Sequence, residues 1–203
     1  MSDISSLNNE NELNQTLFKK YDDLVGFNGI EETQIKSTFK IELGKIRKIS
    51  SRKILGYISQ NYLKCKLDYN ASEFRKLRMA DLKKEHPMKP LRGEIYNAYI
   101  TTNVGSEISG MHPVVVLSNA HTNIYADKIN VLPIEGDGRK VPSYLASLTD
   151  NDLEYGNLLK NPSRIIIPEI LTIDKARLGV KVGKINNSKM LEINKKIAKQ
   201  LSL

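Results

Sequence analysis

One short stretch of the chain gathers several side chains that could do chemistry. Residues 104–119 read VGSEISGMHPVVVLSN. Gly105 and Gly110 permit positive φ and a close backbone approach, while the Ser106 hydroxyl and the loop amides can donate to phosphate oxygens. Glu107 can accept from an exocyclic amine or fix the loop through its own amides. The stretch predicts either a loop that binds a phosphorylated ligand or a self-capped loop before a buried strand.

His112 and Glu135 could form an acid–base pair. Imidazole titrates near neutral pH, and a carboxylate can act as a base where its surroundings raise its pKa. Cleavage of a phosphodiester by a neighbouring hydroxyl needs a base, an acid and a group that stabilises the charged phosphorane. Arg139 could supply that cation, with Arg92 as a second candidate. The structural alternative is a histidine that bonds a loop carbonyl and a glutamate that serves only as a polar turn residue.

The cysteine and histidine content argues against a metal centre. Cys65 is the only cysteine, so an internal disulfide and a Cys-based zinc site are excluded. His86, His112 and His121 have no metal-ligand spacing with one another, and we expect neither a metal nor a cofactor. His86 and His121 are expected at the surface. No run approaches the roughly 18 apolar residues of a membrane span, so a soluble, cytoplasmic protein is expected.

The first ninety residues show helical spacing. Three apolar stripes recur every three or four residues: Leu13, Leu17, Tyr21, Leu24; Ile35, Phe39, Leu43, Ile46; and Ile54, Ile58, Tyr62, Cys65. A fourth, short helix is expected from Asn70 with Ser72 as its N-cap. The segment His86-Pro-Met-Lys-Pro stops it, because proline removes an amide donor and restricts the residue before it. A domain boundary is therefore predicted after Pro90.

The spacing after residue 90 is that of strands. The segments GEIYNAYI, HPVVVLSN, KINVLPI and SRIIIPEILTI are expected to be strands, and Asp137-Gly138 predicts a hairpin turn. A closing helix capped by Ser188 carries one apolar face, made of Met190, Ile193, Ile197 and Leu201. Several short strands with turn chemistry favour a small barrel or sandwich.

Charge is distributed unevenly along the chain. The net charge is +8, a balance typical of proteins with phosphate partners or of a basic, well-solvated surface. Residues 1–35 carry two basic and seven acidic side chains, whereas residues 36–90 carry fifteen basic and five acidic ones. The basic excess therefore belongs to the helical part.

Three separated motifs resemble the MazF/PemK toxins of bacterial toxin–antitoxin systems. RGEIYNAYI, VGSEISGMHPVVVLSN and EILTIDKARLGVKVGKINNSKMLEINKKIAKQLSL agree with that family in order, in spacing and in the closing helix. The resemblance covers about residues 91–203. It leaves out residues 1–90, which such toxins usually lack.

The resemblance implies an α+β chain, with a helical extension followed by a small SH3-like barrel of the MazF/CcdB type and a C-terminal helix. It implies a homodimeric, metal-independent endoribonuclease that cuts single-stranded RNA. It also implies a cognate antitoxin across the RNA groove, with DNA contacted only through the antitoxin complex. Taken together with the chemistry above, the candidate catalytic residues are His112, Glu135 and Arg139. The candidate RNA-binding residues are Arg92, Gly105, Ser106, Glu107, Gly110 and Lys140.

Three positions depart from the family pattern. His112 stands where members usually carry Arg, Glu135 where they usually carry Thr, and Ile108 where Gln often follows Gly-Ser-Glu. The second hypothesis is therefore a degenerate module that binds nucleic acid or a protein without cutting. The helical extension could add RNA or ribosome affinity or hold a partner. Its acidic start could also fold over a basic groove as a built-in antitoxin.

Overall fold

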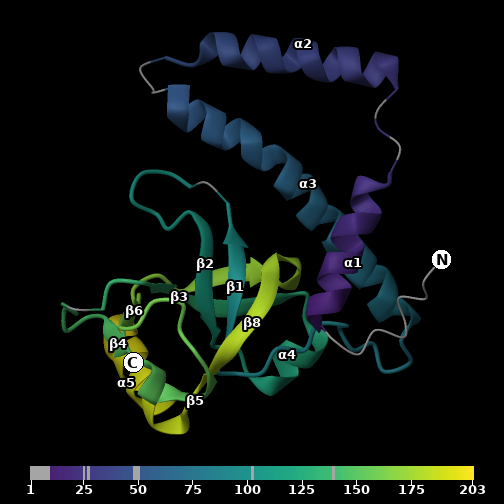
Figure 1. Cartoon of the computed structure of the whole chain (residues 1–203). Helices are drawn as coiled ribbons and strands as arrows, with labels where there is room; N and C mark the ends of the chain where they lie inside the picture. Colours follow the sequence, from purple (N-terminus) through teal and green to yellow (C-terminus); the bar gives the residue numbers. More distant parts are fainter. Residues whose placement is uncertain (1–9, 25, 27, 48–50, 102, 139) are drawn as a thin grey trace.

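The computed structural model describes residues 10–203 except 25, 27, 48–50, 102 and 139. The expected α+β architecture is confirmed: helices come first, a curled antiparallel sheet follows, and a helix ends the chain (Figure 1). Among the described helices, none combines the length and the apolar character that a membrane span requires.

Three helices form the N-terminal part: α1 (Glu10–Asp22), α2 (Gly29–Lys45) and α3 (Ser51–Ala80). Leu13 and Leu17 of the first predicted stripe are buried, which confirms that α1 has a core face. The second stripe lies on α2, but no residue of this helix is buried. Figure 1 shows α2 on the far side of α3 from the sheet.

The fourth, short helix is a wrong prediction. Helix α3 continues through Asn70 and Ser72 without interruption. Leu67 and Phe74 are buried two turns apart, with Ala71 partly buried between them, so the apolar face of α3 extends across the expected break. Packing against the sheet overrides the preference of Asn and Ser for helix starts.

Within the part of the chain that the structure describes, eight strands form the sheet. They are β1 (Glu94–Ile100), β2 (Gly110–Val116), β3 (Lys128–Glu135), β4 (Ala146–Leu148), β5 (Leu153–Gly156), β6 (Ser163–Ile165), β7 (Leu171–Asp174) and β8 (Leu178–Ile185). The order is β4-β6-β3-β2-β1-β8-β5, and β7 pairs with the first half of β3. Because β6 pairs with the end of β3 and β7 with its start, the sheet curls around this central strand.

Two strand predictions need correction. The segment SRIIIPEILTI contains two strands, β6 and β7, instead of one. The hairpin at Asp137-Gly138 is wrong, because β6 pairs with both β3 and β4 and so separates them. Gly138 has another role: a Cβ there would lie 2.3 Å from the carbonyl oxygen of Ser163. The glycine allows loop 136–138 to approach the start of β6.

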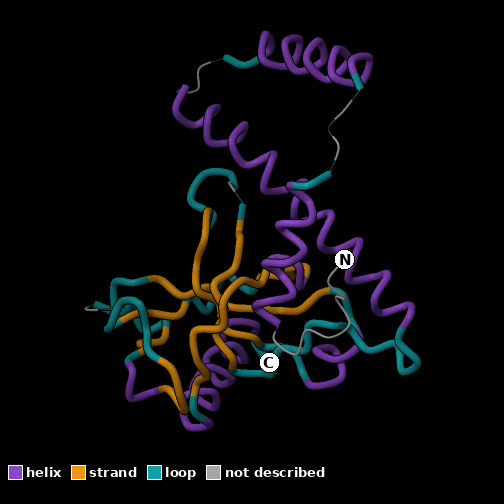
Figure 2. The backbone as a smooth tube through the Cα atoms, turned by 45° about the vertical axis from the view of Figure 1, so that its right-hand side comes forward, coloured by secondary structure: helices purple, strands orange, loops and turns teal. Residues whose placement is uncertain are grey.

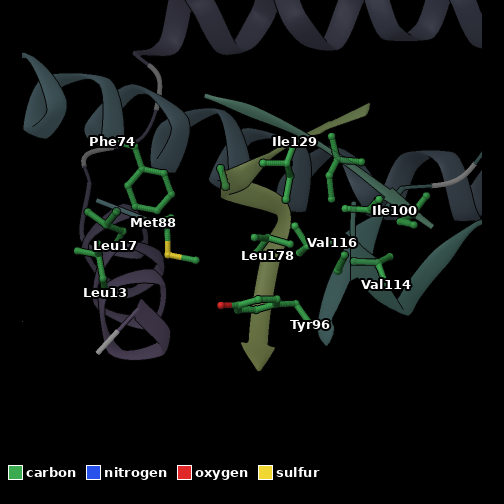
Figure 3. Packing of buried hydrophobic residues seen from close by; sticks show 14 of the residues in the cluster. Leu13, Leu17, Phe74, Met88, Tyr96, Ile100, Val114, Val116, Ile129 and Leu178 are labelled. Carbon is green, nitrogen blue, oxygen red and sulfur yellow. The ribbon is translucent and has the colours of Figure 1, made fainter. Parts of the chain in front are cut away.

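The two faces of the sheet pack differently. One face, with Tyr96, Val114 and Leu178, packs against Leu13 and Phe74 of the helical extension and forms a single core with them (Figure 3). The opposite face packs against α5 (Asn187–Leu201) through a second cluster that includes Ile193. The extension therefore covers a sheet face with apolar contacts.

The C-terminal helix is confirmed, with a different cap. Asn186 accepts a hydrogen bond from the amide of Lys189 and is the N-cap of α5, whereas Ser188 lies inside the helix. Ile193 is fully buried and Leu201 is exposed. A short helix, α4 (Ala120–Tyr125), and two 3-10 turns, η2 (Asp150–Asp152) and η3 (Lys175–Arg177), complete the described elements.

Candidate nucleic-acid site

The loop between β1 and β2 has a shape fixed by its own hydrogen bonds. It projects beyond the sheet at the end of the β1–β2 hairpin (Figure 2). The Asn103 side chain donates to the Ile108 carbonyl at 2.8 Å, and the Asn103 amide donates to the Ser109 hydroxyl at 3.0 Å. Ile108 is buried in the core that the extension shares. The ends of the loop are thereby anchored.

The tip of the loop is exposed and capped. The Glu107 carboxylate accepts from the Val104 amide at 3.2 Å, which is the self-capped arrangement weighed as the alternative for this residue. Gly105 and Gly110 have φ of +61° and +94°, as their positions predicted. Ser106 is exposed at the tip. The backbone and the Ser106 hydroxyl are therefore presented to solvent, while Glu107 braces the loop.

His112 lies on β2, two residues after the loop. Its Nε2 is 2.9 Å from the carbonyl oxygen of Ser109. Because a carbonyl oxygen only accepts, Nε2 carries the proton of this bond, and a neutral ring presents Nδ1 as an acceptor. The ring is half-buried and held against the loop. This contact is also the one expected if His112 had only a structural role.

Glu135 ends β3 and is held by a residue that sequence reasoning missed. Arg164 of β6 donates from Nε at 3.0 Å and from Nη2 at 2.7 Å, both to Oε2 of Glu135. The two residues are direct partners across the strands. The pKa of Arg164 is raised, chiefly by this hydrogen bond. Both side chains are partly exposed, with 28% exposure for Arg164 and 37% for Glu135.

The three side chains share one sheet face. Val114 and Val116 of β2 lie in the core under the extension, so by alternation His112 faces the same way. Ile134 and Ile165 belong to the opposite core, so their neighbours Glu135 and Arg164 also face the extension's side. The candidate site therefore lies at one end of this sheet face, beyond the part on which the extension packs.

His112 and Glu135 are not hydrogen-bonded to each other. The β2–β3 pairs run from Val116↔Val131 to Val114↔Pro133, and the same register two residues further sets His112 opposite Glu135. Pairing between these strands stops before that point, and β3 pairs with β6 instead. The structure brings both residues to one region of the sheet, with His112 bonded to its loop and Glu135 to Arg164.

The remaining predicted residues are dispersed. Arg139 lies outside the described residues, and Lys140 is exposed in the loop that follows β3. Arg92 precedes β1, at the opposite end of that strand from the loop, and donates to Asn194 of α5 at 2.6 Å. Arg92 lines a separate pocket beside α4 and α5, and burial lowers its pKa. The structure therefore does not bring Arg92 together with the loop.

Of the two histidines expected at the surface, one is buried. His121 is exposed, as predicted. His86 is 1% exposed, and its Nδ1 accepts from the Met88 amide at 2.9 Å while its ring packs edge-on against Phe74. Burial, together with the charge of Lys175, lowers the pKa of His86 to about 3. The buried neutral ring joins α3 to the sheet and has no place in the candidate site.

Arg164 gave a weak signal in the sequence. It follows Asn161-Pro162-Ser163 and opens an apolar run, IIIP. A single charged residue before such a run indicates an exposed strand position. Its closeness to Glu135 depends on β6 pairing with the end of β3, which local spacing did not predict.

Comparisons with known proteins agree on one family. The family described as PemK-like, MazF-like toxin of type II toxin-antitoxin system matches residues 91–201. The chain is 32% identical over 115 residues to an endoribonuclease MazF of Staphylococcus saprophyticus subsp. saprophyticus, covering 55% of this chain and 91% of the relative.

Two solved structures are also similar. MazF from Deinococcus radiodurans has a TM-score of 0.47 at 18% identity, over 56% of this chain and 97% of that one. An endoribonuclease from a mycobacterial species has a TM-score of 0.45 at 20% identity, over 57% and 93%. From the match of residues 91–201 and the staphylococcal relative, the chain belongs to the PemK-like, MazF-like toxins of type II toxin–antitoxin systems.

Proposed function

We propose that this protein is a metal-independent endoribonuclease that cuts single-stranded RNA at the uncovered end of the sheet face. The observation that carries the proposal is the position of His112. It is held against a braced, exposed loop on the same sheet face as the partly exposed Glu135–Arg164 pair. The family membership and the relative's activity as an endoribonuclease support it.

The side chains can divide the chemistry of cleavage by a 2′-hydroxyl. With Nε2–H bonded to Ser109, Nδ1 of His112 is the acceptor that can take or return a proton. Arg164 takes over the phosphate-binding role first assigned to Arg139. Its Nε and Nη2 are oriented by Glu135, which leaves Nη1 to stabilise charge on the phosphorane. Glu135 is then a positioning residue for Arg164 as well as the candidate base.

The loop can position the RNA backbone. Ser106 and the amides near Gly105 and Gly110 are exposed donors suited to phosphate oxygens, and Lys140 adds a cation in the loop after β3. Glu107 braces this surface through Val104. A depression lined by Gly136, Asp137 and the 159–162 segment adjoins Glu135 and extends the surface.

The test is a cleavage assay on a long RNA of mixed sequence with EDTA present. We expect cuts at a short recurring sequence and products that end in a 2′,3′-cyclic phosphate, because the 2′-hydroxyl is the nucleophile. If neither the full chain nor residues 91–203 cut any RNA while binding persists, the degenerate binding module replaces this proposal.

Partners follow from the family. A toxin of a type II system implies a cognate antitoxin, and DNA contact would be indirect, through their complex. We propose a cytoplasmic homodimer on the same grounds. Because α1 and α3 already cover one sheet face, a dimer contact would use another surface. Light scattering at micromolar concentration tests this, and a monomer would refute it.

A boundary near residue 90 remains part of the proposal. The family match begins at residue 91, next to the predicted boundary. The shared core means that the two parts are in close contact, so the boundary separates folding units only if residues 91–203 fold without the extension.

A further inference from the structure

The helical arm is a part of the extension that contributes no residue to the core shared with the sheet. We define it as residues 29–66, which comprise α2 and the first half of α3. Ile35 and Phe39 of α2 are 48% and 38% exposed, and Leu55 of α3 is 63% exposed. The side-chain hydrogen bonds and ion pairs of the described residues of α2 all join residues between Asn28 and Arg47.

Such an arrangement is unusual for a helix. An isolated helix of 17 residues is marginal in water, because most helical stability in proteins comes from packing one face. The capping box formed by Asn28 and Glu31 fixes the start of α2 but supplies no packing. Ile35 and Phe39 are one helical turn apart, and together with the half-buried Leu43 they form an apolar stripe in which no side chain is fully buried.

The charge of the arm indicates which kind of partner could bind the apolar stripe. Residues 29–66 hold nine Lys or Arg and three Glu, a net of +6. All three glutamates are engaged locally: Glu31 caps Asn28, Glu32 pairs with Lys36, and Glu42 pairs with Lys45. Among the described cations of the arm, Lys40, Arg47 and Lys64 have no acidic partner, and Arg47 donates only to backbone carbonyls. Uncompensated charge on the arm is therefore positive.

We propose that the arm is a docking surface for an acidic protein helix that carries apolar side chains at helical spacing. An acidic partner complements the net charge, and its apolar side chains bury Ile35, Phe39 and Leu43. Single-stranded RNA would match the charge but would leave these side chains exposed. A second copy of the arm would bury them but would bring two like-charged arms together.

Selection from a peptide library tests this directly. A displayed library of random 16-residue peptides is panned on the full chain, with counter-selection on Phe39→Ala. The substitution removes an exposed side chain and retains helix propensity, which circular dichroism checks. Leu191→Ala is the matched control, because Leu191 is 60% exposed on α5, a helix outside the arm.

We expect peptides that depend on Phe39 to be rich in Asp and Glu, with apolar residues at i, i+3 or i+4, and i+7. Their affinity should fall about tenfold or more in Phe39→Ala and also fall in Lys40→Glu, but not in Leu191→Ala. RNA cleavage should be the same in all three variants, so this result is separable from the proposed nuclease.

Three results would overturn the proposal. One is that no peptide enriches in a Phe39-dependent way, or that the enriched peptides lack acidic residues. Another is a loss of single-stranded RNA binding in Phe39→Ala that does not occur in Leu191→Ala, which would make the stripe a nucleic-acid surface. The third is a dimer of the full chain that Phe39→Ala dissociates, which would place a second copy on the stripe.

Discussion

Arg164 donates two hydrogen bonds to a single oxygen of Glu135, at 3.0 Å from Nε and 2.7 Å from Nη2. The pair joins β6 to the end of β3, beside the point where the pairing of β3 with β2 ends. A guanidinium fixed in this way is oriented before RNA arrives. Glu135 therefore acts on the chemistry at least partly through Arg164.

Arg164→Ala should separate catalysis from stability. The ion pair is partly exposed, so its loss should cost the folded state less than about 1 kcal/mol. Removing a preorganised donor from the phosphorane should slow cleavage about 10²–10³-fold. Single-turnover cleavage and urea unfolding measure the two effects, with Arg75→Ala as a control on an exposed arginine of α3. Equal cleavage by both variants would remove Arg164 from the site.

Glu135→Gln should slow cleavage and change its pH dependence. The amide retains one acceptor oxygen but no charge, so Arg164 is held less firmly and no carboxylate remains to titrate. If His112 and Glu135 both exchange protons, the parent's pH–rate profile is bell-shaped and the variant loses the acid limb. A variant profile identical to the parent's would leave Glu135 with a positioning role alone.

His86 should make the folded state weaker in acid. Its pKa is about 3 when folded and about 6.5 when unfolded, so between these values the unfolded chain binds a proton that the folded chain does not. The free energy of unfolding therefore falls as pH falls below 6.5, by about 2 kcal/mol between pH 7.5 and pH 5. Urea unfolding should show a smaller drop in His86→Gln, and the parental drop in His121→Gln. Equal drops in all three proteins would contradict this origin.

The extension should contribute stability to the sheet. Phe74 is fully buried in the core that both parts share, and Phe74→Ala should cost about 3–5 kcal/mol. Residues 91–203 alone should still unfold cooperatively, at a lower midpoint than the full chain because that face loses its cover. Calorimetry checks both. A fragment that is unfolded or aggregated from the start would refute a boundary near residue 90.

The spacing of apolar residues within a segment predicted the helices and strands better than it predicted which strands pair. The alternation in GEIYNAYI and the face of Met190 and Ile193 were enough to predict β1 and α5, because each pattern depends on its own segment. Asp137-Gly138 was misread as a hairpin, since the position of β6 between β3 and β4 depends on contacts distant in sequence. The continuity of α3 through Ser72 has the same cause.

In the candidate site, too, contacts between residues close in sequence were predictable, whereas contacts between distant residues were not. The loop glycines and His112 lie together because they are adjacent in sequence, and their arrangement follows from one hairpin. Arg164 was missed because it reaches Glu135 from 29 residues away. The burial of His86 likewise arises only when α3 packs on the sheet, a contact that the spacing of His86 and Pro87 does not encode.

The most direct test of the nuclease is cleavage of mixed-sequence RNA, in EDTA, by the parent protein and by His112→Ala. Proton transfer by a positioned side chain contributes about 10²–10⁴-fold to rate, while one loop contact adds little to binding. We expect the parent to cut and His112→Ala to lose cleavage by that factor with nearly unchanged RNA affinity. In His112→Arg a cation still faces the phosphate but cannot take the proton, so we expect cleavage between those of the parent and His112→Ala. Unchanged cleavage by His112→Ala would contradict the assignment of His112 as the group that moves the proton.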